Sequence, residues 1–310
     1  MKISLLTFLQ YWCTDTDVKN RWHESKSYTT ILSESNQDVS YWTGCDKKLA
    51  FHHVDIGRSN TTVIFVNGLL SSMYGTKCNA LRSYCKEKRL GFLCFDYRGH
   101  GQSSGNFIDF TMHDWIEDAS DMLDHVISLG KEQHQESNVI LVGSSLGAWI
   151  SLVLAMQRPV EISAVIGIGS AIDYTFDTYA KLTDEQRTMW ENPIENGSTS
   201  NNVVRVSSPY LDDAFPFTRD FYLSGNDYLI CQEDHLSRGI TNRELLCPVR
   251  FLHGDKDDVI PYTKIYDAAD ALQSKHSGTD ITIKLLKGGD HRLSTANDVA
   301  VIVETLHELL

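Results

Sequence analysis

The chain has 310 residues, of which 42% are hydrophobic and 22% charged, and its formal net charge is −13. This composition is typical of a folded globular protein, and the length suffices for one large α/β domain or two small ones. The acidic balance argues against binding nucleic acid or an anionic membrane surface through bulk charge, because both favour Lys and Arg. No run of 18 apolar residues is present, so the sequence predicts no transmembrane segment.

Strand-like and helix-like segments alternate along the chain from residue 41. Apolar, β-branched runs predict buried strands, and amphipathic or long apolar segments predict helices. In chain order the expected elements are a strand at 49–56, a strand at 61–68, a helix at 77–89, a strand at 90–96, a helix at 111–129, a strand at 138–143, a helix at 146–156, a strand at 162–169, a strand at 247–254, a helix at 262–273, a strand at 281–289 and a final helix ending at 310. Thr111, with Asp114 three residues on, is the expected N-cap of the helix at 111–129. The alternation predicts a mostly parallel sheet with helices on both faces.

One long segment interrupts this alternation. Residues 170–246 separate two expected strands that a single crossover helix would connect, and they are polar, aromatic and poor in strand-like runs. Inserts of this length between core elements are usually functional or disordered. We interpret residues 170–246 as a mainly helical lid, inserted after the sixth strand of a domain that spans residues 41–310. Residues 1–40 are left as an unassigned N-terminal segment.

Two adjacent serines lie between glycines in VILVGSSLGAW, residues 139–149. The pattern Gly-x-Ser-x-Gly fits only with Ser145 at its centre, and it falls between an expected strand and an expected helix, the context of a nucleophile elbow. Such a turn strains the backbone of the nucleophile, and it requires small residues two positions to either side, here Gly143 and Gly147. Ser145 would point its hydroxyl outward at a helix N-terminus, where N–H groups favour developing negative charge. We assign Ser144 no catalytic role.

A serine hydroxyl is a weak nucleophile at neutral pH and needs a base. In chains with this elbow the order along the sequence is serine, acid, histidine. Two segments that follow expected strands supply candidates, namely the acids Asp255, Asp257 and Asp258 in HGDKDDVIP and the base His291, with Asp290 beside it, in GGDHRLS. Both segments lie just past the carboxyl ends of strands, where α/β sheets place their sites. His291 would take the proton of Ser145, and the acid would hold its imidazole in the required tautomer.

Several further segments make the pattern more specific. They are NGLLSSMYGTKCNAL, FDYRGHGQSSG, TMHDWIEDASDMLD, VGSSLGAW, CPVRFLHGDKDDVIP and GGDHRLS, which fall within residues 62–294. By these segments the chain resembles the serine α/β-hydrolases. Among the serine α/β-hydrolases it resembles the branch that includes the mitochondrial palmitoyl-protein thioesterases, also described as acyl-glucuronide esterases, and their bacterial relatives. The SSMYGTK run and the GDHRLS ending are the most specific parts, because generic hydrolases lack both.

This resemblance implies an α/β-hydrolase fold and completes the expected site. The acid of the family falls four residues after the His of its HGxxD motif, which is Asp257 here, with Asp255 and Asp258 as alternatives. The oxyanion hole would use the backbone N–H groups of Leu146, directly after the nucleophile, and of Leu69, in the loop after the strand at 61–68. No metal and no organic cofactor are implied.

The chain departs from the family in three places. Asn67 stands before Gly68, where a Pro or His is usual, the lid is longer and more polar around 192–203, and residues 1–40 match nothing in the family. The N-terminus has only a short apolar run and is not Arg-rich, so it indicates neither a signal peptide nor a transit peptide clearly. The seven cysteines show no metal-ligand spacing and favour free thiols in a reducing compartment. We expect a cytoplasmic or mitochondrial protein, with secretion less favoured.

The preferred function is a serine hydrolase that cleaves a carboxylic ester or an acyl thioester through an acyl-enzyme. Its substrate would be a small-molecule ester or an acylated protein, and the oligomeric state stays open. The alternatives are a serine peptidase of the same fold and a non-catalytic scaffold that binds a ligand or partner. Other prominent residues are interpreted as structural, with Asp96–Gly101 as a loop-shaping cluster and Trp115 and Trp149 as core. The residues expected in the pocket wall are Tyr174, Phe176 and Phe221.

Overall fold

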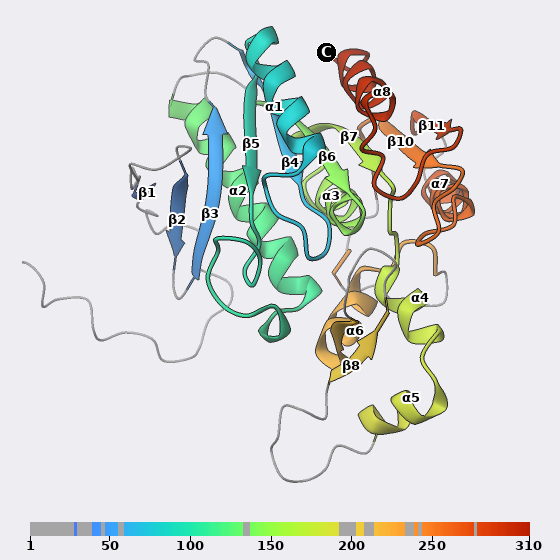
Figure 1. Cartoon of the computed structure of the whole chain (residues 1–310). Coiled ribbons are helices and arrows are strands. Elements are labelled where there is room, and N and C mark those ends of the chain that lie inside the picture. Colours follow the sequence, from blue (N-terminus) through green and yellow to red (C-terminus); the bar gives the residue numbers. More distant parts are fainter. Residues whose placement is uncertain are drawn as a thin grey trace, which may run out of the picture.

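A mixed β-sheet runs across the molecule from β1 to β11 (Figure 1). The computed structural model describes residues 28–29, 39–44, 47–54, 59–132, 137–191, 203–207, 214–232, 239–240, 244–275 and 278–310. Within these residues the sheet has nine strands in the order β1-β2-β3-β5-β4-β6-β7-β10-β11. They are β1 Tyr28–Thr29, β2 Ser40–Gly44, β3 Lys47–Val54, β4 Thr61–Val66, β5 Gly91–Phe95, β6 Asn138–Ser144, β7 Ile162–Ile168, β10 Val249–Gly254 and β11 Ile281–Leu286.

The pairing directions divide the sheet into two parts. β1, β2, β3 and β5 pair antiparallel, whereas the pairs β5–β4, β4–β6, β6–β7, β7–β10 and β10–β11 are parallel. Because parallel strands end at the same edge, the loops after β4, β6, β7, β10 and β11 all leave from one edge. The mostly parallel sheet predicted from the alternation of elements is thereby confirmed.

Helices cover both faces of the sheet. The long helices are α1 Thr76–Lys88, α2 Met112–Glu132, α3 Leu146–Gln157, α7 Thr263–Lys275 and α8 Ala296–His307. The apolar sides of α2, α3 and α7 share one buried cluster with one face of the sheet, and those of α1 and α8 share a second cluster with the other. The predicted Thr111 cap of α2 is confirmed, since the Asp114 N–H donates to the Thr111 hydroxyl oxygen at 3.5 Å and Asp114 Oδ2 accepts from the Thr111 N–H at 2.8 Å.

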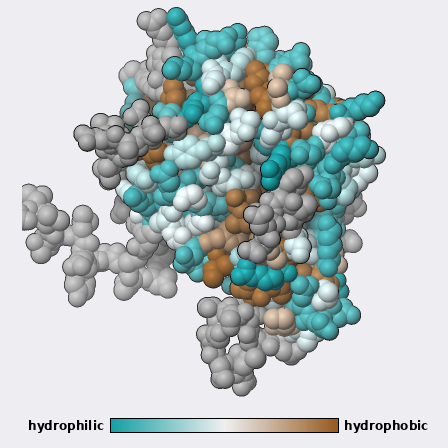
Figure 2. Space-filling model, viewed as in Figure 1, coloured by the Kyte–Doolittle hydropathy of each residue, from teal (hydrophilic) through white to brown (hydrophobic). Residues whose placement is uncertain are grey.

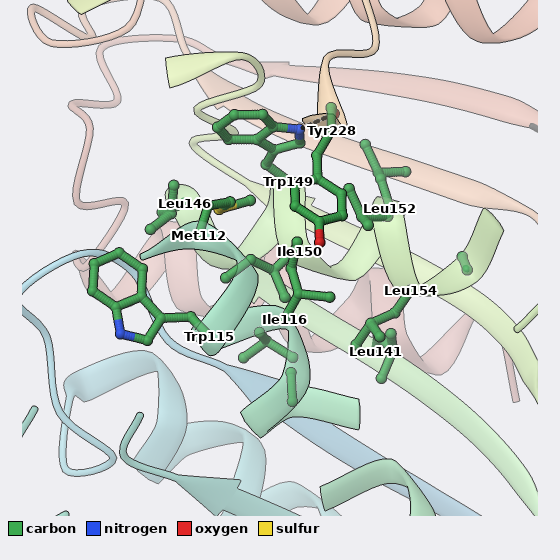
Figure 3. Packing of buried hydrophobic residues seen from close by; sticks show 14 of the residues in the cluster. Met112, Trp115, Ile116, Leu141, Leu146, Trp149, Ile150, Leu152, Leu154 and Tyr228 are labelled. Carbon is green, nitrogen blue, oxygen red and sulfur yellow. Dashed lines mark hydrogen bonds between the residues drawn. The ribbon is translucent and has the colours of Figure 1, made fainter. Parts of the chain in front are cut away.

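The core between α2 and α3 is built from large side chains (Figure 3). Trp115 and Trp149 are both fully buried, which confirms their expected place in the core. Trp149 Nε1–H donates to the carbonyl oxygen of Tyr228 at 3.0 Å. This bond fixes the returning end of the inserted segment to α3, the helix that follows Ser145.

The segment between β7 and β10 carries its own elements, which lie beyond one end of the sheet (Figure 1). They are α4 Tyr174–Ala180, α5 Asp184–Glu191, β8 Val203–Val206, β9 Phe215–Thr218, α6 Arg219–Gly225 and the short 3₁₀ helix η3 Asn226–Tyr228. β7 is the sixth strand when the two-residue β1 is not counted. Helices predominate, as predicted, but β8 and β9 also form an antiparallel pair that the sequence did not predict. The polar stretch at 192–202 lies outside the described residues.

The face seen in Figure 2 is mostly hydrophilic, with hydrophobic residues at several places, near the top as well as around and below the centre of the view. Within the part of the chain that the structure describes, no helix has both the length and the apolar character needed to cross a membrane. Five cysteines of the described ranges are free thiols, and Cys13 and Cys45 lie outside those ranges.

Candidate active site

The turn between β6 and α3 holds Ser145 in a strained conformation. Its φ is 54° and its ψ is −119°, in a region that side-chain-bearing residues rarely occupy. A Cβ on Gly143 would lie 2.3 Å from the carbonyl oxygen of Gly147, and a Cβ on Gly147 would lie 2.1 Å from that of Val66. Strand, helix and the neighbouring strand β4 therefore approach so closely that only glycine fits, as the Gly-x-Ser-x-Gly spacing predicts.

Gly147→Ala is expected to destabilise the fold by about 3 kcal/mol, because the new methyl group meets fixed backbone oxygens rather than a side chain that can move. Urea unfolding followed by circular dichroism measures the change. Gly75→Ala is the matched control, since a Cβ there meets nothing within 4 Å, and its effect should stay below about 1 kcal/mol. Equal stability of the two variants would show that the elbow is less tightly packed than described.

Ser145, His291 and Asp257 form one hydrogen-bonded series. His291 Nε2 lies 3.0 Å from Ser145 Oγ, and His291 Nδ1 lies 2.8 Å from Asp257 Oδ2. Because Asp257 Oδ2 accepts from Nδ1, the proton of a neutral imidazole lies on Nδ1 and leaves Nε2 able to accept from the serine. The three residues come from the ends of β6, β11 and β10, where the sequence placed them.

The Asp257 carboxylate is buried and saturated with donors. Its side chain is fully shielded from solvent, and Oδ1 accepts from the backbone N–H groups of Val259 and Ile260 at 2.9 and 2.8 Å. Burial alone would raise the pKa of this carboxyl, but hydrogen bonds from His253 and His291 outweigh burial and hold the pKa well below its usual range. The group therefore stays ionised at neutral pH.

The other carboxylates of these two loops have different contacts. Asp255 Oδ1 accepts from the N–H of Gly288 at 2.5 Å, and Asp290 Oδ1 accepts from the N–H of Leu293 at 3.0 Å. Asp258 is exposed. Of the acids that the sequence left as alternatives, Asp257 is the one placed against His291.

A cavity of about 360 Å³ opens beside Ser145 and His291. Leu69 and Leu146, the two residues expected to form the oxyanion hole, both line it. Leu146 is the first residue of α3, where a backbone N–H has no partner within the helix. The structure thus brings the expected site residues to one place, with Asp257 behind His291.

The inserted segment between β7 and β10 forms part of the cavity wall. The inserted segment contributes Tyr174 and Phe215, whose rings stack at 6.5 Å. The expectation for Tyr174 is confirmed, but that for Phe221 is wrong, because Phe221 is buried against Trp115 at 5.0 Å between ring centroids. Phe176 packs against the hydrophobic core and is not part of the cavity lining. The sequence places these rings in the segment but does not tell which side of each short helix faces the cavity.

The loop that carries Leu69 is held by the Asp96–Gly101 cluster. The Leu70 N–H donates to His100 Nε2 at 3.1 Å, and the Met73 N–H donates to Asp96 Oδ1 at 2.8 Å. His100 Nδ1 lies 3.2 Å from the carbonyl oxygen of Arg98, which fixes the neutral tautomer with its proton on Nδ1. The loop-shaping role predicted for the cluster agrees with these contacts.

Burial lowers the pKa of His100 to about 4, from an ordinary value near 6.5. The unfolded chain therefore binds a proton that the folded chain excludes, and stability should fall as pH decreases from about 6.5 to about 4. This histidine alone would account for up to about 3 kcal/mol of that loss. In His100→Gln, whose amide oxygen can accept from Leu70, the melting temperature should depend less on pH over this range than in the wild type. Parallel curves of melting temperature against pH would contradict this assignment.

Asn67 explains how the loop tolerates a departure from the family pattern. Its side-chain Nδ2 donates to the carbonyl oxygen of Phe95 at 2.5 Å, and its own carbonyl oxygen accepts from the Tyr97 hydroxyl at 3.0 Å. The amide thus bridges the ends of β4 and β5. The buried position is satisfied by hydrogen bonds to backbone and side chain.

Two contacts at the site were missed by the sequence analysis. His253 Nε2 lies 3.0 Å from Asp257 Oδ2, and the Lys77 ammonium donates to the carbonyl oxygen of Arg292, which follows His291. Burial lowers the pKa of Lys77 to about 8. His253 is the first residue of the HGxxD motif, so the sequence could have drawn attention to it. Its contact with Asp257, however, depends on how the loop after β10 folds back. Among the described residues, no group of three or more His, Cys, Asp or Glu side chains is arranged to hold a metal ion.

Comparison with known proteins places this chain in a family. A family model described as serine aminopeptidase, S33, matches residues 57–203. The mitochondrial palmitoyl-protein thioesterase ABHD10 of mouse is 32% identical over 248 residues, which cover 80% of this chain and 74% of the relative. Human ABHD10 is 30% identical over 256 residues, covering 80% and 72% of the two chains.

A solved structure agrees with the sequence relatives. The structure of alpha/beta hydrolase domain-containing protein 10 from mouse matches with a TM-score of 0.72 and 28% identity, over 88% of this chain and 98% of that one. The fold, the elbow and the identity over most of both chains lead to one assignment. This chain is a hydrolase of the α/β-hydrolase fold and belongs to the ABHD10 family.

Proposed function

We propose that this chain is a serine hydrolase that cleaves a carboxylic ester or an acyl thioester through an acyl-enzyme. The observation that carries the proposal is the hydrogen-bonded series from Ser145 Oγ through His291 to the buried Asp257 carboxylate, beside a cavity. The names of the relatives support the same chemistry, because they are palmitoyl-protein thioesterases.

Acylation would begin with attack of Ser145 Oγ on the carbonyl carbon of the substrate. His291 Nε2 takes the hydroxyl proton and then delivers it to the departing alcohol or thiol, which leaves the acyl group on Ser145. Asp257 stabilises the imidazolium that forms between these steps, since its charge lies 2.8 Å from Nδ1. In deacylation, water takes the place of the alcohol or thiol, and His291 acts again as base and then acid.

Negative charge on the carbonyl oxygen would be stabilised by the backbone N–H groups of Leu69 and Leu146. Both residues line the cavity beside Ser145. The hydrogen bond from Leu70 to His100 fixes the peptide next to Leu69, so the donor is oriented before substrate binds. One such donor is typically worth about 3 kcal/mol of transition-state stabilisation.

The cavity walls indicate how a substrate would be placed. Tyr174 and Phe215 contribute apolar rings to the lining that suit an acyl chain, and polar residues such as Ser71 and Thr76 also line the cavity. Thioesters and oxygen esters use the same triad, so the choice between them depends on these walls. Since Tyr174 and Phe215 come from the segment between β7 and β10, we propose residues 170–246 as the lid of a domain spanning 41–310. The relatives' mitochondrial location favours mitochondria over the cytoplasm for this chain.

A substrate panel tests the proposed function. The full chain is assayed at pH 7.5 against acyl thioesters, 4-nitrophenyl esters and acyl glucuronides of increasing chain length, with an aminoacyl peptide substrate included because of the family description. Hydrolysis of at least one ester or thioester series is expected, with loss of that activity in His291→Ala. Cleavage of the peptide alone would replace the proposal with a peptidase. No hydrolysis by a folded sample would favour a non-catalytic scaffold.

A further inference from the structure

His253 is a second imidazole in contact with the Asp257 carboxylate. It lies near the end of β10, and its side chain is fully buried. Its Nε2 is 3.0 Å from Asp257 Oδ2 and 2.9 Å from the carbonyl oxygen of Ile260. Both neighbours of Nε2 can only accept, because the carboxylate is ionised and a carbonyl has no proton. The proton of a neutral His253 therefore lies on Nε2, which bonds the Ile260 carbonyl oxygen and lies against the Asp257 carboxylate.

The other ring nitrogen of His253, Nδ1, makes no comparable contact among the described residues. Within the described ranges, His253 Nδ1 is buried and has no hydrogen-bond partner. A buried nitrogen without a partner is unfavourable, and an apolar side chain of similar volume would avoid that cost. The histidine is therefore explained by what Nε2 does rather than by its packing.

The contacts of Asp257 show what Nε2 adds. Oδ1 is occupied by two backbone N–H groups, from Val259 and Ile260, and Oδ2 is shared by His253 and His291. The backbone donors hold one end of the carboxylate, and His253 contacts the other end, at the same oxygen that His291 contacts. The His253 contact to Ile260 also closes the loop that presents Asp257.

We propose that His253 is a positioning residue that holds the Asp257 carboxylate and tempers its charge toward His291. The proposal rests on the proposed function, since it assigns Asp257 as the acid of the triad. A hydrogen bond on Oδ2 withdraws part of the negative charge that attracts the imidazolium of His291. Without it, the carboxylate would be less restrained and would stabilise protonated His291 more strongly.

Among the described residues, the titratable side chains in contact with this carboxylate are His253 and His291. On the same loop, Asp255 is bonded to a backbone N–H of the neighbouring loop, and Asp258 is exposed. On the adjacent strand β11, the residue in register with His253 is Leu285, and on the His291 loop Asp290 bonds the N–H of Leu293.

The test compares His253→Gln with His253→Leu in the full chain. A glutamine amide can place a donor near the position of Nε2, whereas leucine fills similar volume without one. For His253→Gln we expect kcat within about threefold of the wild type and an unchanged pH profile. For His253→Leu we expect kcat to fall about 10-fold to 100-fold with little change in KM. The acid limb of its kcat–pH profile should move up by about half a pH unit or more.

Two outcomes would overturn the proposal. One is a loss of activity in His253→Leu with an unmoved acid limb, which packing damage alone would produce, and the other is equal behaviour of the leucine and glutamine variants. If His253→Leu does not fold, histidine ¹⁵N NMR of the wild type decides, because the proposal requires Nε2 protonated and Nδ1 unprotonated. Failure of the proposed function is recognised separately, since the wild type would then show no hydrolysis to compare.

Discussion

Ser145→Ala is expected to lower kcat/KM for the best ester or thioester substrate by at least about 10⁵-fold, with the melting temperature nearly unchanged. Alanine keeps the Cβ and so keeps the shape of the elbow, but it removes the oxygen that lies 3.0 Å from His291 Nε2. No covalent acyl-enzyme can then form, and the activity that stays is what the oxyanion donors and substrate binding provide. Steady-state hydrolysis and a thermal melt of both proteins measure the two quantities.

Ser144→Ala is the matched control for this variant. Ser144 also lines the cavity and lies next to Ser145, but it is the last residue of β6 and is not the hydroxyl that His291 contacts. Its replacement should change kcat/KM by less than about threefold. A large loss in Ser144→Ala with retained activity in Ser145→Ala would mean that the nucleophile has been assigned to the wrong serine.

Asp257→Asn is expected to lower kcat by about 10⁴-fold. The two backbone N–H groups on Oδ1 require an oxygen at that position, so the asparagine amide nitrogen must face His253 and His291. His291 would then have to accept at Nδ1 and carry its proton on Nε2, and that tautomer cannot take the proton of Ser145. Steady-state kinetics on the full chain provides the test.

Asp255→Asn and Asp258→Asn are the controls for the choice of acid. Asp255 contacts a backbone N–H of another loop, and Asp258 is exposed, so each replacement should cost less than about 10-fold in kcat. An equal or larger loss in either variant than in Asp257→Asn would show that the acid lies elsewhere on this loop.

The elbow could be read from sequence because its chemistry and its sterics are both local. The spacing of Gly143 and Gly147 around Ser145 reports how closely β6, α3 and β4 approach, and the flanking strand and helix are strongly patterned. His291 and the acid could be placed on the same edge, because the carboxyl ends of parallel strands meet there. The residues alone left three candidates for the acid, and Asp257 was chosen only by resemblance.

What the sequence could not provide depends on contacts across the fold. The β8–β9 pair consists of two four-residue strands within a polar segment, too short to show a period. Phe215 lines the cavity, whereas Phe221 packs against Trp115 of α2. The direction in which each ring points depends on this packing and not on sequence spacing. The contact of His253 with Asp257 requires the loop after β10 to fold back on itself, which no spacing in HGDKD specifies.

Labelling with a fluorophosphonate probe, followed by intact mass and peptide mapping, tests the assignment of Ser145 most directly. The reagent reacts with a serine only when a neighbouring base activates it, so it reports the series from Ser145 to His291 without a known substrate. We predict one adduct per chain, located on Ser145 and absent in His291→Ala. An adduct on another residue, or none in a folded sample, would contradict the proposal that Ser145 is the activated nucleophile of a serine hydrolase.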